Sequence, residues 1–325
     1  MTGFDDIQGQ EGAVTLLKQA VSCGRIPNAW MFAGPQGVGK MRTARALALV
    51  LNCETRHPSS ATACGECSSC RTLAGGNHPD LIVIEPEKHE IRVAQIRSVC
   101  AALEKKAFAT RKRLVVLDQA ERMNPGAANA ALKILEEPPD NTHFVLVAEE
   151  IENVLPTIRS RCQQVTFGPL PHRTIVTLLQ QEHGIDAETS KRIASVCSGS
   201  MKRALLMAET KWFLWREWVL DGLEQMDRFH PSERLLFGEL LLSRADHLDE
   251  TLDWMAGWYR DALCIRYGSS RLLNVDRRES IARAVQHRTT RDLTETLAAL
   301  TRMRRKTHGR ANLKLMMDNL VLTLA

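Results

Sequence analysis

The stretch Gly34-Pro35-Gln36-Gly37-Val38-Gly39-Lys40 has the residue types and the spacing of a phosphate-binding loop, with the pattern G-x-x-x-x-G-K. Glycine adopts backbone angles that other residues avoid, so the loop amides can curl around an anion. An apolar run at 29–33 predicts a strand before the loop, and residues 41–51 predict a helix after it. Because the start of that helix adds partial positive charge, this context favours phosphate binding over a chance glycine turn. Lys40 would reach the outer phosphates.

Met41 stands where this loop pattern normally ends in Ser or Thr, whose hydroxyl binds Mg²⁺. A thioether is a poor ligand for a hard cation that prefers oxygen. Thr43 lies two residues further along, so it would point to another side of the helix. The loop is therefore expected to hold phosphate but to be badly equipped to hold the metal.

Four of the nine cysteines, Cys53, Cys64, Cys67 and Cys70, follow the spacing C-x10-C-x2-C-x2-C. The odd total and the close spacing argue for a metal site in a reducing compartment rather than for a disulfide framework. Four thiolates in this arrangement suit tetrahedral zinc. The alternatives are four unliganded thiols, or a set in which His57 replaces one sulfur. An insertion of this size has no core of its own, so zinc would fold it.

A second apolar run, residues 114–117, ends at Asp118. An acid at the carboxyl end of such a strand commonly helps to hold Mg²⁺ beside the phosphate loop, although it can also cap the next turn. Gln119 follows where an active ATPase of this type usually has a Glu that polarises water. An amide can orient water but cannot accept its proton, and Glu121 is not expected to share that position. Weak or absent ATP hydrolysis is therefore expected.

Apolar runs alternate with helical patterns through the first half of the chain, which predicts a parallel sheet covered on both faces. Residues 4–21 read as an amphipathic helix. The predicted strands are 29–33, 81–84, 114–117 and 144–148, with a fifth candidate at 164–167. Beyond Pro169 only helical patterns follow. The predicted domains are 1–168, with a zinc-binding insertion at about 53–70, then a three-helix lid at 169–209 and an all-helical domain at 210–325.

The composition is ordinary for a soluble globular protein, with 44% hydrophobic and 25% charged residues in 325. No apolar run approaches membrane-spanning length and the start shows no signal-peptide pattern, so a cytoplasmic location without membrane contact is expected. The net charge of +5 permits contact with nucleic acid without requiring it. The basic run Arg302–Lys306, with Arg310, fits a solvated helix end or a contact with a partner or nucleic acid.

Taken together, these residues resemble the clamp-loader branch of the AAA+ ATPases, which serves bacterial DNA polymerase III. The resemblance runs from about Phe4 through Arg203. Besides the loop and the four cysteines, it rests on two specific stretches, Asn129–Pro139 (NAALKILEEPP) and Leu155–Cys162 (LPTIRSRC).

That family contains a gamma/tau type of subunit, which is the ATPase motor, and a delta-prime type, which often has a decayed ATP site. This sequence is similar to the delta-prime type at three positions. Met41 and Gln119 depart from the motor pattern, and Ala148 stands where the motor usually has a Thr. The intact loop Gly34–Lys40 points the other way, so ATP binding with poor hydrolysis is the expectation.

The resemblance implies an AAA+ core, a helical lid and a helical collar that holds the subunit in a five-membered ring with gamma/tau and delta subunits. Such a ring opens the sliding clamp and places it on primed DNA. The resemblance also implies that Arg161 acts in trans as an arginine finger for a neighbouring ATP site, the alternative being a surface arginine paired with a carboxylate.

Two other functions compete with this one. The chain could be an active motor of the gamma/tau type, or a zinc-dependent nucleic-acid-binding protein with a vestigial nucleotide fold. Steady-state ATPase activity of the isolated chain separates the gamma/tau motor from the delta-prime hypothesis. A strong, salt-dependent affinity for DNA would support the nucleic-acid-binding protein.

Overall fold

The computed structural model describes residues 3–57, 60–76, 78–104, 112–244, 247–270, 272–307 and 312–324. Arg310 of the basic run lies outside these residues. The chain divides into two compact units. We call them the sheet unit, Met1–Thr174 with Gly199–Lys202, and the helical unit, Ile175–Ser198 with Arg203–Ala325. The predicted three-domain division is a finer proposal than this.

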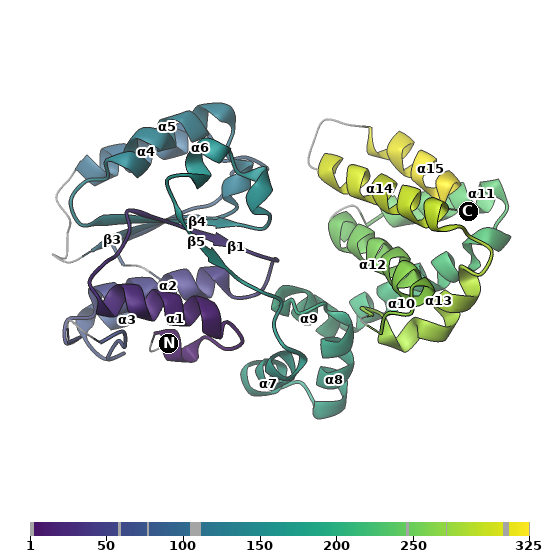
Figure 1. The fold of residues 1–325 in the computed structure, drawn as a ribbon, viewed down its shortest axis with the longest axis horizontal. Helices are drawn as coiled ribbons and strands as arrows, with labels where there is room; N and C mark the ends of the chain where they lie inside the picture. Colours follow the sequence, from purple (N-terminus) through teal and green to yellow (C-terminus); the bar gives the residue numbers. More distant parts are fainter. Residues whose placement is uncertain are drawn as a thin grey trace. The chain divides into compact units, whose positions relative to one another are not determined.

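The sheet unit is built on five parallel strands in the order β2-β3-β4-β1-β5 (Figure 1). They are β1 (Ala29–Ala33), β2 (Leu81–Ile84), β3 (Arg113–Leu117), β4 (Thr142–Ala148) and β5 (Gln163–Thr166). The strands β1, β3 and β4 are buried along their whole length, as expected for mainly apolar strands in a sheet covered on both faces, and β3 and β4 also bury Arg113, Thr142 and His143 at their starts. The four predicted strands and the fifth candidate are all present.

Helices cover both faces of this sheet (Figure 1). One face carries α1 (Glu11–Ser22), α2 (Lys40–Asn52) and α3 (Ser68–Ala74), and the other carries α4 (Val93–Glu104), α5 (Pro125–Glu136) and α6 (Pro156–Arg159). The short 3₁₀ helices are η1 (Phe4–Asp6) before α1, η2 (Ala120–Arg122) after β3 and η3 (Ile151–Asn153) after β4. Apolar side chains of α4 and α5 form one core cluster with those of the strands. The predicted α/β class is confirmed.

The helix predicted for residues 4–21 is wrong at its start, because α1 begins only at Glu11. Gly9 has a φ of 74°, and a Cβ at this position would lie 2.9 Å from Cδ of Pro171. The chain therefore turns tightly against the segment that follows β5. The Gln10 side chain then donates to the carbonyl oxygen of Gly168 at 2.7 Å, a tertiary contact that a helical pattern cannot reveal.

The remaining helices form the helical unit and the segments that lead into it. They are α7 (His172–His183), α8 (Ala187–Val196), α9 (Met201–Ala208), α10 (Thr210–Gln225), α11 (Pro231–Leu242), α12 (Leu248–Arg266), α13 (Arg278–Ala284), α14 (Thr290–Lys306) and α15 (Leu313–Thr323), with η4 (Met226–Arg228) and η6 (Val275–Arg277). α12 is central, since it packs against α10, α11, α13 and α14 and buries Trp258 and Tyr259. The predicted all-helical character is confirmed. Within the described ranges, no helix combines the length and apolar character needed to span a bilayer.

Candidate nucleotide site, cysteine cluster and arginine turn

The predicted phosphate loop connects the end of β1 to the start of α2. Two of its glycines are required by close packing. A Cβ at Gly34 would lie 2.1 Å from the carbonyl oxygen of Phe167, and one at Gly37 would lie 2.6 Å from the backbone nitrogen of Lys202. Both have positive φ angles, 152° and 75°. The loop thus has the backbone form that a phosphate cradle needs, at the carboxyl edge of a parallel sheet.

Lys40 is the first residue of α2 and only 7% of it is exposed. Its ammonium group turns back on the loop and donates to the carbonyl oxygens of Gly34 and Pro35, the latter at 2.7 Å. Burial lowers the pKa of Lys40, and nearby carboxylates partly oppose that shift. A phosphate entering the loop would compete with these two carbonyl oxygens for the ammonium group.

Three acids lie close enough to Lys40 to act on its pKa: Glu149, Glu121 and Asp118, in decreasing order of effect. Asp118 directly follows β3, as predicted. Glu121 was not expected to take part, yet Gln119 adopts a left-handed φ of 53°, so the chain turns sharply there and enters η2. Burial raises the pKa of Glu121, and one of its carboxylate oxygens accepts the N–H of Glu149 at 3.3 Å.

The metal position of the loop offers no oxygen. Met41 occupies the second position of α2, as the sequence shows. Thr43 does not replace the missing hydroxyl, because it is fully buried and its hydroxyl donates to the carbonyl oxygen of Gly39 at 3.0 Å. The arrangement can hold phosphate through backbone amides and a lysine, but it lacks the oxygen ligand that positions Mg²⁺ on this type of loop.

Lys202 is a second cation at the phosphate loop, and no motif in the sequence predicts it there. Its ammonium group donates to the side-chain oxygen of Gln36 at 3.2 Å, while the N–H of Met201 donates to the carbonyl oxygen of Gly37 at 2.9 Å. The available signal was the turn at Ser198-Gly199 before a helix whose second residue is a lysine. Its distance of more than 150 residues along the chain from the loop concealed the contact.

The sulfur atoms of Cys53, Cys64, Cys67 and Cys70 all lie within 4.8 Å of one another. In tetrahedral zinc sites the Zn–S bonds of about 2.3 Å place the sulfurs about 3.8 Å apart, so a modest contraction would close this group on one ion. Cys53 follows α2, and Cys64 lies in the segment between α2 and α3. Cys67 caps the start of α3, and Cys70 lies in the first turn of that helix. His57 does not belong to the group.

Backbone N–H groups point at these sulfurs, as they do around metal-bound thiolates. The N–H groups of Glu66 and Cys67 donate to Sγ of Cys64 at 3.4 and 3.3 Å, and that of Cys70 donates to Sγ of Cys67 at 3.4 Å. Hydrogen bonds from Thr55 and from the N–H groups of Cys67 and Glu66 lower the pKa of Cys64 to about 6, whereas burial raises the pKa of Cys70. At Cys64 these donors favour the thiolate, the form that binds zinc.

Arg161 lies in the turn between α6 and β5. Its Nε donates to a carboxylate oxygen of Glu136 at 2.6 Å, and Nη2 contacts the same oxygen. Nη1 donates to the carbonyl oxygen of Thr157 at 2.8 Å. The two charged side chains are 34% and 49% exposed. The structure therefore shows the ion pair that the alternative interpretation named, on a partly exposed turn.

Two family profiles match this chain. The family described as DNA polymerase III, delta subunit matches residues 9–171, and the family described as DNA polymerase III, delta subunit, C terminal matches residues 216–325. DNA polymerase III subunit delta′ of Bacillus subtilis is 28% identical over 97% of this chain and 96% of its own length. The delta′ subunit of Pseudomonas aeruginosa is 44% identical over 44% of each chain. DNA polymerase III subunit tau of Escherichia coli is 33% identical over 63% of this chain and 32% of its own length.

The strand order, the phosphate loop after β1 and the acid after β3, followed by an all-helical region, define a protein of the AAA+ class. Within that class the chain belongs to the delta-prime family of DNA polymerase III clamp-loader subunits. The matches to this family extend into both units, whereas the tau relative matches a smaller share of the chain. The gamma/tau alternative is therefore not favoured.

Proposed function

We propose that this subunit completes the ATP site of a neighbouring gamma/tau subunit through Arg161 while hydrolysing little ATP itself. It would do so in a ring with gamma/tau and delta subunits that opens the sliding clamp and loads it onto primed DNA. The observation that supports weak hydrolysis is a well-formed phosphate loop whose metal position holds Met41, with Thr43 buried and bonded to the carbonyl oxygen of Gly39. The role of Arg161 is supported by the family to which the chain belongs and by its position on a partly exposed turn. The test is reconstitution with the other loader subunits, comparing DNA-stimulated ATPase and clamp loading with and without this chain.

Nucleotide binding by the chain itself would use the loop amides, Lys40 and Lys202. Binding should depend only weakly on Mg²⁺, because the loop offers the ion no hydroxyl oxygen. Gln119 cannot accept a proton from water, and one oxygen of Glu121, which lies two residues further along, is already bonded to the backbone of Glu149. The site is thus better suited to holding a nucleotide than to cleaving it.

We expect the isolated chain to turn over ATP far more slowly than the roughly one per second of an ordinary ATPase. A steady-state phosphate-release assay measures this rate. Lys40→Ala is the matched control, because a contaminating ATPase would survive the change. Turnover at or above that rate that Lys40→Ala abolishes would contradict the proposal.

We also propose that Cys53, Cys64, Cys67 and Cys70 bind one zinc ion that folds the insertion. Support comes from the clustering of the four sulfurs and from the N–H groups directed at them. The role is structural, because four thiolates leave no open coordination position. Such a site requires reduced thiols, which agrees with the proposed cytoplasmic location.

Metal analysis of the purified protein is expected to give about one zinc per chain. Cys67→Ser should lower zinc retention and make the insertion sensitive to protease. The sheet should stay folded, since Cys67 is only partly buried and the core cluster beneath α4 and α5 contains none of the four cysteines. Cys23→Ser is the matched control, because Cys23 is exposed and outside the cluster. Zinc well below one equivalent in the unaltered protein, or equal loss in both variants, would count against the site.

A further inference from the structure

The helical unit contains an open cleft of about 520 Å³ that the proposed function does not use. Residues from the end of α8, from α9, α12 and α14, and from the segment before η6 line it. Its volume lies within the range of about 300–1,000 Å³ that is common for binding pockets.

Three arginines from three different helices line this cleft: Arg203 of α9, Arg260 of α12 and Arg304 of α14. Asp253 is the acidic side chain among the lining residues, and it binds Nη2 of Arg203 and, at 2.8 Å, Nη1 of Arg304. Asp253 thereby holds the guanidinium groups of Arg203 and Arg304 in place, but its single negative charge does not balance the three positive charges of the arginines. Arg304 belongs to the basic run Arg302–Lys306. If that run contacts a partner, this cleft is where the contact would be made.

Arg260 is the most exposed of the three guanidinium groups, at 44% of its side chain. Its neighbour Asp261 is fully buried and accepts the N–H groups of Leu273 and Asn274 at 2.9 and 2.6 Å. The carboxylate of Asp261 is thus committed to the backbone, although Arg260 also donates to it at 3.1 Å. The cleft consequently presents a net positive charge to an incoming ligand.

The walls of the cleft add apolar surface and an unusual backbone position. Val196, Leu273 and Leu297 contribute aliphatic side chains. Ser198 lies at the end of α8 with a left-handed φ of 54°, where glycine is the usual residue. Ser198 thus lines the cleft in a conformation that glycine adopts more easily, and such strain is often associated with binding.

We propose that this cleft binds a short acidic and partly apolar peptide segment of a partner protein. Guanidinium groups recognise carboxylates through paired N–H donors, and the aliphatic walls would receive the intervening apolar side chains. Single-stranded nucleic acid is less well matched, because its binding sites normally offer exposed aromatic rings for base stacking. The aromatic side chain in the lining is Trp254, which is only 6% exposed. The proposal does not depend on hydrolysis or on Arg161.

The test uses the full chain and fluorescence anisotropy of a labelled peptide of alternating glutamate and leucine. A peptide of alternating lysine and leucine, and a labelled oligothymidylate, are the competing probes. We expect the acidic peptide to bind and to weaken as salt is raised, with Arg260→Glu lowering its affinity by about tenfold or more. Arg278→Glu, the same change at an exposed arginine outside the cleft, should alter the affinity by less than about twofold.

Failure of the acidic peptide to bind, equal binding of the lysine peptide, or equal losses from Arg260→Glu and Arg278→Glu would overturn the proposal. Oligothymidylate binding that Arg260→Glu selectively removes would overturn it in favour of a nucleic-acid site. Because Arg260 also donates to the buried carboxylate of Asp261, the test includes a circular-dichroism spectrum, and a spectrum equal to that of the unaltered chain shows that the loss of binding is not a loss of fold.

Discussion

A clamp loader reconstituted with the Arg161→Ala variant is expected to lose at least about tenfold in clamp-loading rate. An arginine finger supplied in trans contributes roughly 10³–10⁵ to phosphoryl transfer at the site it completes, because its planar cation holds the oxygens that gain charge. Sites that do not use Arg161 would continue to hydrolyse ATP. Total DNA-stimulated ATPase should therefore fall by less than clamp loading does.

Arg161→Lys separates charge from geometry. Lysine keeps the positive charge but cannot form two parallel N–H bonds, so most of the loss should remain. Arg97→Ala, an exposed arginine of α4 in the same unit, is the matched control and should load clamps normally. If the Arg161→Ala complex loads clamps at the unaltered rate, Arg161 is not the finger.

The contact with Glu136 makes this experiment interpretable. An exposed ion pair of this kind contributes only about 0–1 kcal/mol to stability, so Arg161→Ala should leave folding and ring assembly nearly unchanged. The same weakness means that the guanidinium can leave Glu136 when a neighbouring subunit offers a triphosphate. A loss of clamp loading without a loss of assembly would then report on catalysis alone.

The fold was predictable from sequence where the signal is local. Apolar runs flanked by turn residues located the strands, because a strand buried on both faces is mainly apolar. The start of α1 was not predictable in this way. It depends on Gly9 packing against Pro171 and on the bond from Gln10 to Gly168, contacts between segments more than 150 residues apart.

In the candidate nucleotide site, too, the features with a local sequence signal were predictable and those that depend on tertiary contacts were not. Its loop was predictable from the glycine spacing, and Asp118 from the end of an apolar run. The place of Glu121 beside Lys40 was not, because it follows from a left-handed backbone angle at Gln119, which the residue type does not specify. Lys202 was missed because the approach of α9 to the loop is a tertiary contact with no local pattern.

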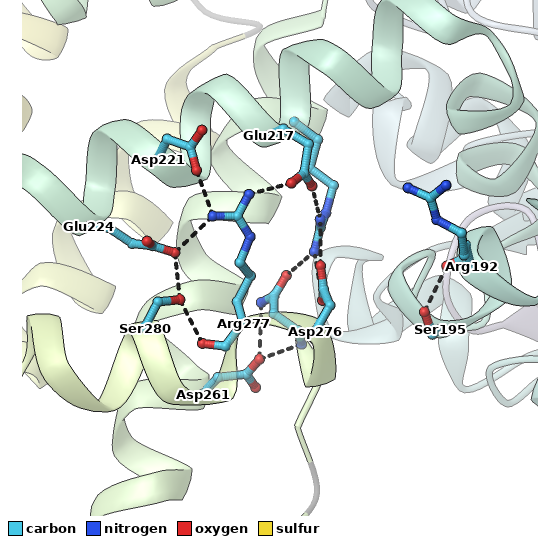
Figure 2. A network of polar contacts seen from close by, with 11 residues as sticks. Arg192, Ser195, Glu217, Asp221, Glu224, Asp261, Asp276, Arg277 and Ser280 are labelled. Atoms are coloured by element: carbon cyan, nitrogen blue, oxygen red, sulfur yellow. Dashed lines mark hydrogen bonds and ion pairs between the residues drawn. The ribbon is translucent and has the colours of Figure 1, made fainter.

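A buried polar network in the helical unit supports a prediction about stability. Arg216 of α10 is fully buried, and its Nη1 and Nη2 donate to the two carboxylate oxygens of Asp276 at 3.2 and 3.4 Å. Nη2 also donates to the side-chain oxygen of Asn274 at 2.7 Å. Alongside it, Arg277 reaches three acids of α10, Glu217, Asp221 and Glu224 (Figure 2). The network thus joins α10 to the segment that leads into α13.

Arg216→Ala is expected to destabilise the helical unit by about 3–5 kcal/mol, because it opens a cavity and leaves the buried oxygen of Asn274 without its donor. That is a large share of the roughly 5–15 kcal/mol that holds a typical domain folded. Urea denaturation followed by tryptophan fluorescence measures the change, since every tryptophan except Trp30 lies in α10 or α12. Arg278→Ala, at an exposed position of α13, should shift stability by no more than about 0.5 kcal/mol. Equal unfolding midpoints for Arg216→Ala and the unaltered chain would show that this network does not hold the helical unit together.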